Sequence, residues 1–380
     1  MKKLHRTRTI FCLALAGLLV FPSCLWADAK NEEDILKVEF SEIGPLVEIH
    51  NLTANEAADS IEDSEEAKQD GLNAIDNAIL QLDLLSSTLI LTDFTLYPNA
   101  TPTHDDILYA LLTGQKQSLN QQRRSLSVID VDKLEIQRDM AIDIVTSSLE
   151  TVYISYNSLG RQLELLNVQK DLADAQLSAL VKQQDLGMVA EVVVNKTKNE
   201  IRALENSIKQ LERSRQTLKE QFNLTLSYEF DRPLEIGEVP GVMRSLIVTT
   251  DVEYDYKHAW EDSYNVVLNE DEDSETEADA IRNFRHGFYS AYQTMLDKQD
   301  TLELENTKLK TVETDYEIAK QKHILGMISD LQFKTEENGY YNQKIVVKLA
   351  EDTVYQAYRN YEWAKRGLIV SSPSSSATGE

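Results

Sequence analysis

The sequence has very little cysteine: Cys12 and Cys24 are the two among its 380 residues. Residues 1–27 have the features of a secretory signal peptide, with a basic start, an apolar run over 10–20 and Ala27 before the expected cleavage point. Cleavage after Ala27 removes both thiols, which excludes a disulfide framework and a thiolate metal site from the mature chain. The alternative at this end of the chain is lipidation at Cys24.

Positive charge is also scarce, since 38 Lys and Arg residues accompany 64 Asp and Glu residues and the formal net charge is -26. So acidic a surface excludes nucleic acid as a partner, because that binding needs cationic patches. It also excludes charge-driven docking on anionic lipid. Beyond residues 1–27, no apolar run approaches the roughly 20 residues that a membrane-spanning helix needs. We therefore expect an exported protein of the cell envelope, with its membrane contact left open.

Motifs that carry chemistry are missing as well. The histidines are scattered, without a pair at metal-ligand spacing on one helix face, and neither a glycine-rich phosphate loop nor a Gly-x-Ser-x-Gly elbow occurs. The acidic run 270–279 has part of the spacing of a calcium loop, but Thr276 stands where that loop needs glycine. The sequence thus predicts no enzyme activity, no metal and no cofactor, and it predicts a solvated loop over 270–279.

Proline and glycine are few, with 7 and 13 residues, and good helix formers such as Leu, Glu, Lys, Gln and Ala are abundant. The most informative feature is a short sequence that occurs twice, Leu186-Gly187-Met188 and Leu325-Gly326-Met327. Each copy lies between long stretches in which apolar residues recur every three or four positions, which is the spacing of coiled-coil helices. A glycine there supplies the left-handed conformation that ends one helix and reverses the chain. We predict two long antiparallel helical hairpins with tips near 187 and 326.

Both halves share this order of elements, as an internal duplication would give. The predicted divisions are a signal peptide over 1–27, a first helical repeat over 28–240, a second over 241–370 and a disordered Ser-rich tail over 371–380. Within them we expect long helices over 131–186, 191–226 and 281–324 and a helical stretch over 251–268. Residues 28–50 are predicted to be irregular, and the alternative is a short edge strand over 46–49.

Polar residues interrupt the apolar seams of the hairpins. Lys170 and Arg215 in the first hairpin either set the register of its helices, as polar core residues do in coiled coils, or mark points where the seam opens. Four seam tyrosines either fill the helix interface with their hydroxyls toward water or line a conduit. These are Tyr156, Tyr292, Tyr316 and Tyr361.

The repeated tips, the twofold repeat and the signal peptide resemble the TolC family, the outer-membrane channel components of drug-efflux pumps and type I secretion systems. The resemblance rests on Leu186-Gly187-Met188-Val189-Ala190 and Leu325-Gly326-Met327-Ile328-Ser329-Asp330-Leu331. It implies a homotrimer around a hollow helical tunnel, whose tips contact a periplasmic or membrane-fusion adaptor protein that joins an inner-membrane transporter. It also implies β-strands before each long helix, but spanning strands need about 9–11 alternating residues, which neither half offers. The predicted fold class is therefore all-α, two tandem TolC-like helical hairpins with little or no β-barrel.

The hairpin tips are the candidate functional site. At the end of a rod they would expose apolar side chains, which is typical of a surface that binds a partner. We expect a conduit component in the outer membrane or periplasm whose tips dock an adaptor. The alternative is a barrel-less envelope scaffold or spacer without transport, with the cell surface as a further location. The candidate docking residues are Leu186, Gly187, Met188, Val189, Leu325, Gly326, Met327, Ile328, Ser329 and Asp330.

Overall fold

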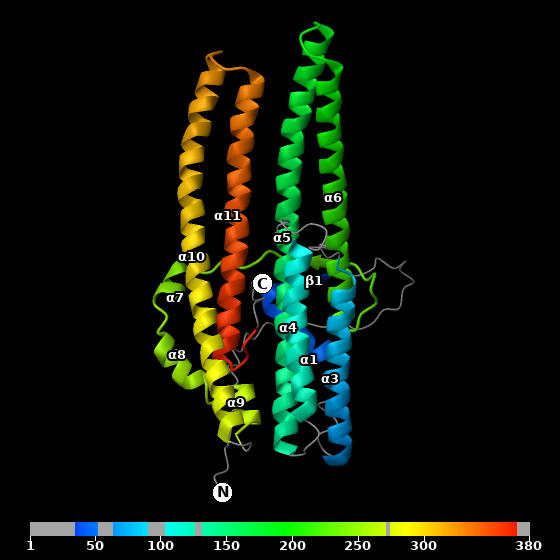
Figure 1. The fold of residues 1–380 in the computed structure, drawn as a ribbon, viewed down its shortest axis with the longest axis vertical. Coiled ribbons are helices and arrows are strands. Elements are labelled where there is room, and N and C mark those ends of the chain that lie inside the picture. Colours follow the sequence, from blue (N-terminus) through cyan, green and yellow to red (C-terminus); the bar gives the residue numbers. More distant parts are fainter. Residues whose placement is uncertain (1–34, 52–63, 90–102, 126–130, 271–273, 371–380) are drawn as a thin grey trace, which may run out of the picture. The chain divides into compact units, whose positions relative to one another are not determined.

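The structure is a computed structural model that describes residues 35–51, 64–89, 103–125, 131–270 and 274–370. The predicted signal peptide, with Cys12 and Cys24, and the predicted tail lie outside the described residues. The elements in chain order (Figure 1) are β1 (Leu36–Val38), the 3-10 turn Phe40–Glu42, α1 (Ile43–His50), α3 (Ser64–Ser87), α4 (His104–Ser125), α5 (Val131–Asp185), α6 (Glu191–Thr225), β2 (Leu234–Ile236), α7 (Arg244–Val248), α8 (Val252–Ala259), α9 (Tyr264–Leu268), α10 (Ser274–Ile324) and α11 (Asp330–Lys365).

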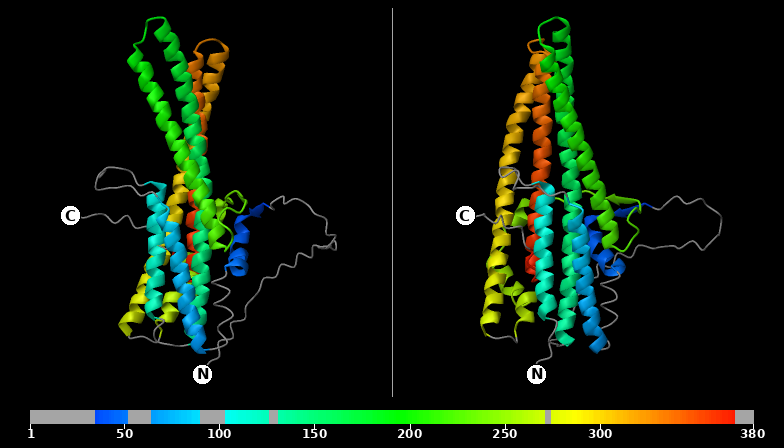
Figure 2. Two further views of the ribbon diagram at one scale, coloured as in Figure 1. Left: turned by 90° about the vertical axis from the view of Figure 1, so that its right-hand side faces the viewer. Right: turned by 45° about the vertical axis from the view of Figure 1, so that its right-hand side comes forward.

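Two long hairpins, α5–α6 and α10–α11, form most of the described chain (Figure 2). Their helices have 55 and 35 residues in the first hairpin and 51 and 36 in the second. The apolar seam explains their pairing, because Ile201, Leu218 and Phe222 of α6 are buried in a helix that packs along α5. The predicted all-α fold with two long antiparallel helical hairpins is confirmed.

The start of α10 corrects one prediction. The helix begins at Ser274, seven residues before the expected position 281, so 274–279 is helical and not a solvated loop. Glu275 and Glu277 lie in its first turn, where carboxylates interact favourably with the free N–H groups and the positive end of the helix dipole. The acidic composition that suggested a loop is therefore also typical of a helix start.

The four long helices lie side by side in the order α10, α11, α5, α6 (Figure 1). Extensive contacts join α10 to α11, α11 to α5, and α5 to α6. Around the lower part of this row, α3 and α4 pack against α5, and the short helices α7, α8 and α9 pack against α10. The row has two unlike edges, α10 at one side and α6 at the other.

The N-terminal described segment differs from its prediction. Residues 28–50 are predicted to be irregular, with an edge strand over 46–49 as the alternative, and α1 overturns both predictions for 43–50. In this helix Ile43 and Val47 are fully buried and lie one turn apart on the face toward the core. The strand is β1 instead, and it pairs in parallel with β2, with Leu36 opposite Leu234. Three residues per strand are too few to show an alternating pattern in the sequence, which is why the pair was not predicted.

The stretch 251–268 is also less regular than predicted, because it forms two short helices. Asp251 caps α8 by accepting a hydrogen bond from the backbone N–H of Tyr254 at 3.1 Å. A turn then separates α8 from α9, and Ser263 and Ala259 on either side of it are fully buried. The break positions Tyr264, whose hydroxyl donates to Asp143 of α5 at 2.6 Å.

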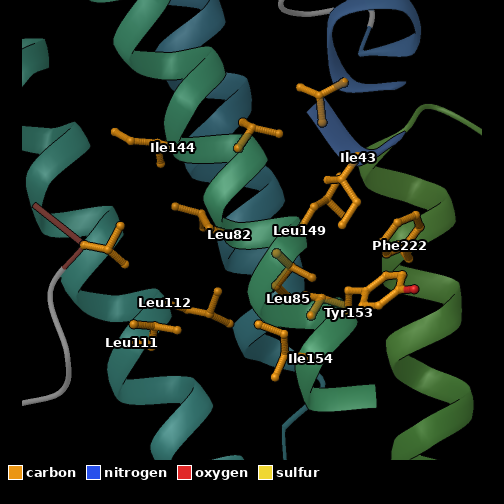
Figure 3. Packing of buried hydrophobic residues seen from close by; sticks show 14 of the residues in the cluster. Ile43, Leu82, Leu85, Leu111, Leu112, Ile144, Leu149, Tyr153, Ile154 and Phe222 are labelled. Atoms are coloured by element: carbon orange, nitrogen blue, oxygen red, sulfur yellow. The ribbon is translucent and has the colours of Figure 1, made fainter. Parts of the chain in front are cut away.

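Buried apolar residues gather in two clusters. The larger one joins α1, α3, α4, α5 and α6 and includes Leu82, Leu112, Leu149, Tyr153 and Phe222 (Figure 3). The smaller joins α7, α8, α10 and α11 around Phe288 and Tyr361. Both clusters lie far along the chain from the tips, so the hairpins project beyond them. None of the described helices is both long enough and apolar enough to cross a bilayer.

Candidate functional site: the two hairpin tips and the seams below them

The two tips have the same backbone geometry. Gly187 and Gly326 adopt φ angles of 73° and 70°, the left-handed conformation predicted from the sequence. At each tip the glycine N–H bonds to the carbonyl three residues back and the next N–H bonds to the carbonyl five residues back, at 2.8–2.9 Å. This is a Schellman motif, which satisfies the last carbonyls of the helix. The predicted glycine turns are confirmed.

Large apolar side chains are exposed on both tips. Leu186 and Met188 are 74% and 72% exposed on the first tip, and Leu325 and Met327 are 72% and 68% exposed on the second. Val192 and Ile324 extend these surfaces, with 72% and 68% exposed. The sequence analysis did not identify Val192 and Ile324. Their positions outside the apolar seam were the available signal, because a residue outside the seam has no partner helix to cover it.

Val189 and Ile328 contribute less than predicted. Both lie between the exposed methionine and the start of the next helix, and both are half-buried. The apolar surface of each tip is therefore formed by the leucine and the methionine on either side of the glycine.

The second tip is held by more contacts than the first. Ser329 caps α11 in a capping box with Gln332, as predicted. His323 Nε2 lies 2.8 Å from Asp330 Oδ1 across the turn, and its ring stacks on Phe333 at a centroid distance of 4.6 Å. On the first tip the cap residue is Ala190, whose side chain makes no capping bond.

The seam residues Lys170 and Arg215 both bridge α5 and α6. Lys170 Nζ lies 2.8 Å from Asp174 on its own helix and 3.8 Å from Glu205 on α6. The Arg215 guanidinium of α6 lies 4.0 Å from the ring centroid of Tyr156 on α5, a cation–π contact. Both positions are thus closed by cross-helix contacts, while their predicted role in setting register stays a prediction.

Gly160 has a structural reason that the sequence did not reveal. A Cβ at this position would lie 3.3 Å from Arg215 Nη2 and 3.4 Å from Arg215 Cζ. The glycine therefore provides the space in which the guanidinium reaches the Tyr156 ring. Its cost in helix propensity is about 1 kcal/mol, which the packing of the two helices offsets.

The contact between the hairpins contains a buried ion pair that was not predicted. Glu150 of α5 accepts hydrogen bonds from Arg359 Nε and Nη2 at 3.0 and 2.6 Å and from Trp363 Nε1 at 2.8 Å, both on α11. The Glu150 side chain is 7% exposed. Because its partners lie about 210 positions later in the chain, no local pattern could indicate the pair.

A second ion pair lies further along the same interface. Arg161 Nε of α5 is 3.2 Å from Asp352 Oδ2 of α11, and Arg161 Nη2 is 2.9 Å from Glu238. Burial raises the pKa of Asp352 to about 6, and the guanidinium of Arg161 and a hydrogen bond from Ser158 offset part of that rise. The two ion pairs fix α5 against α11 and hence one hairpin against the other.

Two of the four seam tyrosines fill helix interfaces. Tyr156 and Tyr361 are 7% and 1% exposed and fill helix interfaces. The Tyr361 hydroxyl donates to Asp255 at 2.8 Å and does not point to water. Tyr292 and Tyr316 are half-buried. The core interpretation therefore holds for the first pair.

The described residues contain no cluster of His, Cys, Asp and Glu side chains that could hold a metal ion. What the tips can do chemically is to bury apolar surface against a partner.

Comparison with known proteins yields structural similarity alone, since no protein-family model and no curated protein matches the sequence. The CmeC outer membrane channel of Campylobacter jejuni has 10% identity and a TM-score of 0.44, over 87% of this chain and 86% of its own. The outer membrane protein VceC of Vibrio cholerae has 13% identity and a TM-score of 0.47, over 86% and 96%. CusC, whose structures concern transmembrane channel formation, has 11% identity and a TM-score of 0.44, over 87% and 97%.

The chain is therefore similar to outer-membrane channel proteins, the class that its repeated tips resemble. With identities of 10–13% and TM-scores under 0.5, this similarity assigns no function. The role of the chain has to come from its own residues.

Proposed function

We propose that this protein is a TolC-like conduit component of an efflux or type I secretion assembly, and that its two hairpin tips dock an adaptor protein. The observation that carries the proposal is the pair of equivalent tips. Each ends in a glycine turn of the same geometry and exposes a leucine and a methionine to at least 68%. Two matching apolar ends on one chain are what a repeated contact with a partner requires.

The chemistry of the tips favours a partner surface with apolar side chains. Burying one exposed Leu or Met gains about 1.5–3 kcal/mol at most, so the four side chains together supply enough for a specific contact. Methionine is flexible and adapts to surfaces of different shape. The rest of the assembly follows the family resemblance: export to the cell envelope, three copies of this chain, a periplasmic or membrane-fusion adaptor and an inner-membrane transporter.

Photocross-linking in the native host tests the docking. A benzophenone amino acid replaces Met188 or Met327, and the control carries it at Met243, which is 66% exposed in the connector before α7. We expect both tips to cross-link to one periplasmic or membrane-fusion adaptor, and the control to yield no such product. Cross-links from neither tip would refute docking.

A transport measurement separates the conduit from the scaffold. The variant Met188→Asp/Met327→Asp places charge on both tips, and its exposed positions leave the fold intact. We expect it to lose export to the same extent as a deletion of the gene, whereas Met243→Asp retains export. If deletion itself leaves export of dyes, drugs and secreted proteins unchanged, the envelope scaffold replaces the conduit.

A further inference from the structure

A hollow of about 80 Å³ lies between the end of α3, the start of α4 and the second half of α6, where α3 packs against α6 (Figure 1). Its floor is apolar, because the buried side chains of Leu108 on α4, Leu159 on α5 and Leu218 on α6 line it. On its rim, Gln210 is 23 residues beyond Gly187, so the hollow is separate from the first tip.

The wall that α6 contributes is polar. Its residues recur at intervals of three and four positions, which places them on one side of the helix. They are Gln210, Arg213, Ser214 and Thr217. Within the part of the chain that the structure describes, none of these four side chains takes part in a hydrogen bond or an ion pair. The guanidinium, the amide and the two hydroxyls are therefore donors that the fold does not use.

The next residue of this polar stripe, Gln221, holds the hollow together. Gln221 is buried, and its Nε2 donates to the carbonyl of Leu85 at 3.3 Å and to the hydroxyl of Thr88, which lines the hollow. These two bonds fix the end of α3 against α6. The hollow is thus bounded by a hydrogen-bonded helix contact as well as by a buried apolar floor.

The wall that α4 contributes carries a negative charge. Asp105 lies in the first turn of α4, lines the hollow and is half-buried. A carboxylate offers about four acceptor positions on its two oxygens, so it can accept from a ligand whatever else it contacts. The hollow therefore combines a cation on α6, an anion on α4 and leucine side chains below them.

We propose that this hollow binds a free amino acid with a small apolar side chain, in the range from alanine to valine. The ligand carboxylate accepts hydrogen bonds from Arg213, Ser214 and Thr217, and a guanidinium suits a carboxylate in geometry as well as in charge. The ligand ammonium donates to Asp105. A zwitterion satisfies both walls, whereas a ligand with one charge leaves the opposite wall without a partner.

The size of the hollow limits the side chain of the ligand. An apolar cavity of about 150 Å³ accepts benzene, so a hollow of about 80 Å³ accepts a side chain of about one to three carbons. The charged ends of the ligand stay at the mouth, where Arg213 and Gln210 are exposed, and the side chain lies on the leucine floor.

The inference is independent of adaptor docking, because no residue of either tip lines the hollow. We expect the tip variant Met188→Asp/Met327→Asp to bind the amino acid as the wild type does. The failure of one proposal therefore leaves the other intact, and the two measurements separate them.

Titration calorimetry of the purified protein at neutral pH tests the site with L-alanine and L-valine. We expect saturable binding with a roughly millimolar dissociation constant, since a ligand of about six heavy atoms makes few contacts. Propionate lacks the ammonium of alanine and ethylamine lacks its carboxylate, and each should bind at least about tenfold more weakly. Binding of propionate as tight as that of alanine would overturn the amino-acid assignment. No saturable binding of either amino acid would overturn the site and leave a hydrated gap.

Two charge variants assign the walls. Arg213→Gln should raise the dissociation constant of alanine about tenfold or more and remove the preference over ethylamine. Asp105→Asn should instead remove the preference over propionate. The matched control is Arg202→Gln, because Arg202 is exposed on α6 and lies 11 residues nearer the tip; we expect its affinity to be unchanged. An equal loss of affinity in the control would show an effect of overall charge and overturn the assignment.

Hydrogen exchange locates the ligand. Because the bound amino acid joins α4 to α6 beside the end of α3, alanine should slow amide exchange in 85–89 and in the adjoining part of α6. Slowing confined to other segments would place the ligand elsewhere and overturn the proposal.

Discussion

The folded protein is expected to become more stable as Asp352 is protonated. The side chain is 3% exposed, and its burial raises the pKa to about 6 from an ordinary value of 3.8, against the opposing effect of Arg161. The folded protein thus binds this proton more tightly than the unfolded chain does. Its contribution to stability is fully present below the unfolded pKa, and it is lost as the pH rises through about 6.

The expected size follows from the two pKa values. A difference of about two units corresponds to roughly 3 kcal/mol of unfolding free energy. We would compare the wild type with Asp352→Asn by urea unfolding between about pH 4 and pH 8, followed by tryptophan fluorescence, to which Trp260 and the buried Trp363, 2% exposed, both contribute. From neutral pH down to about pH 4, the wild type should gain roughly 3 kcal/mol relative to the variant, most of it below about pH 6.

The control is Asp174→Asn, which removes a carboxylate that is 45% exposed and pairs with Lys170. A surface pair of this kind contributes little, so we expect a change below about 0.5 kcal/mol at every pH. A difference between wild type and Asp352→Asn that stays flat across the range would refute the reasoning. A wild-type advantage that grows with rising pH would show that the attraction of Arg161 exceeds the cost of burial.

Three further predictions concern packing and turns. Glu150→Gln should lower the unfolding free energy by about 1.5–3 kcal/mol in thermal or urea melts, because the half-buried Arg359 guanidinium loses its counter-charge; an unchanged melt would contradict this. Gly326→Ala should cost about 1 kcal/mol, because φ is 70° there, and should speed amide exchange at the second tip; slower exchange would contradict the strain. A double-mutant cycle of Tyr156→Leu with Arg215→Met should give a coupling of about 0.5–2 kcal/mol, and zero coupling would exclude the cation–π contact.

The long helices and their tips could be predicted because their signals are local and repeated. A 3–4 apolar spacing over dozens of residues leaves one interpretation, and a glycine between two such stretches fixes the turn. The prediction of short elements was wrong for the opposite reason, because their signals are brief and occur once. Residues 46–49 are mostly apolar and so offered a strand as the alternative to irregular structure, yet Ile43 and Val47 share a helical face that becomes evident only when the core is assembled.

The contacts between the hairpins could not be predicted at all. The sequence places Glu150 and Arg161 on a helix whose polar residues would ordinarily face solvent, and their partners on α11 lie some 190–210 positions away. The role of Gly160 could not be predicted for the same reason, because its contact Arg215 lies on another helix. Only the position of Arg215 shows that the glycine makes room for a guanidinium.

The location of these polar contacts bears on how the tips would work. Glu150–Arg359 and Arg161–Asp352 both join α5 to α11, the two inner helices of the row, and both lie well below the tips. Buried ion pairs add little net stability, but they penalise any sliding of one helix past the other, since a shift would leave buried charges unpaired. These ion pairs therefore hold the register of the two hairpins, and with it the relative position of the two tips. The exposed apolar residues at the tips are left free to contact partners. A chain organised in this way presents both tips as one unit with a set spacing. Because the ion pairs set this spacing, they should also affect docking. We expect Glu150→Gln to weaken the contacts that the tips make with a partner, although the tips lie far from the substituted residue.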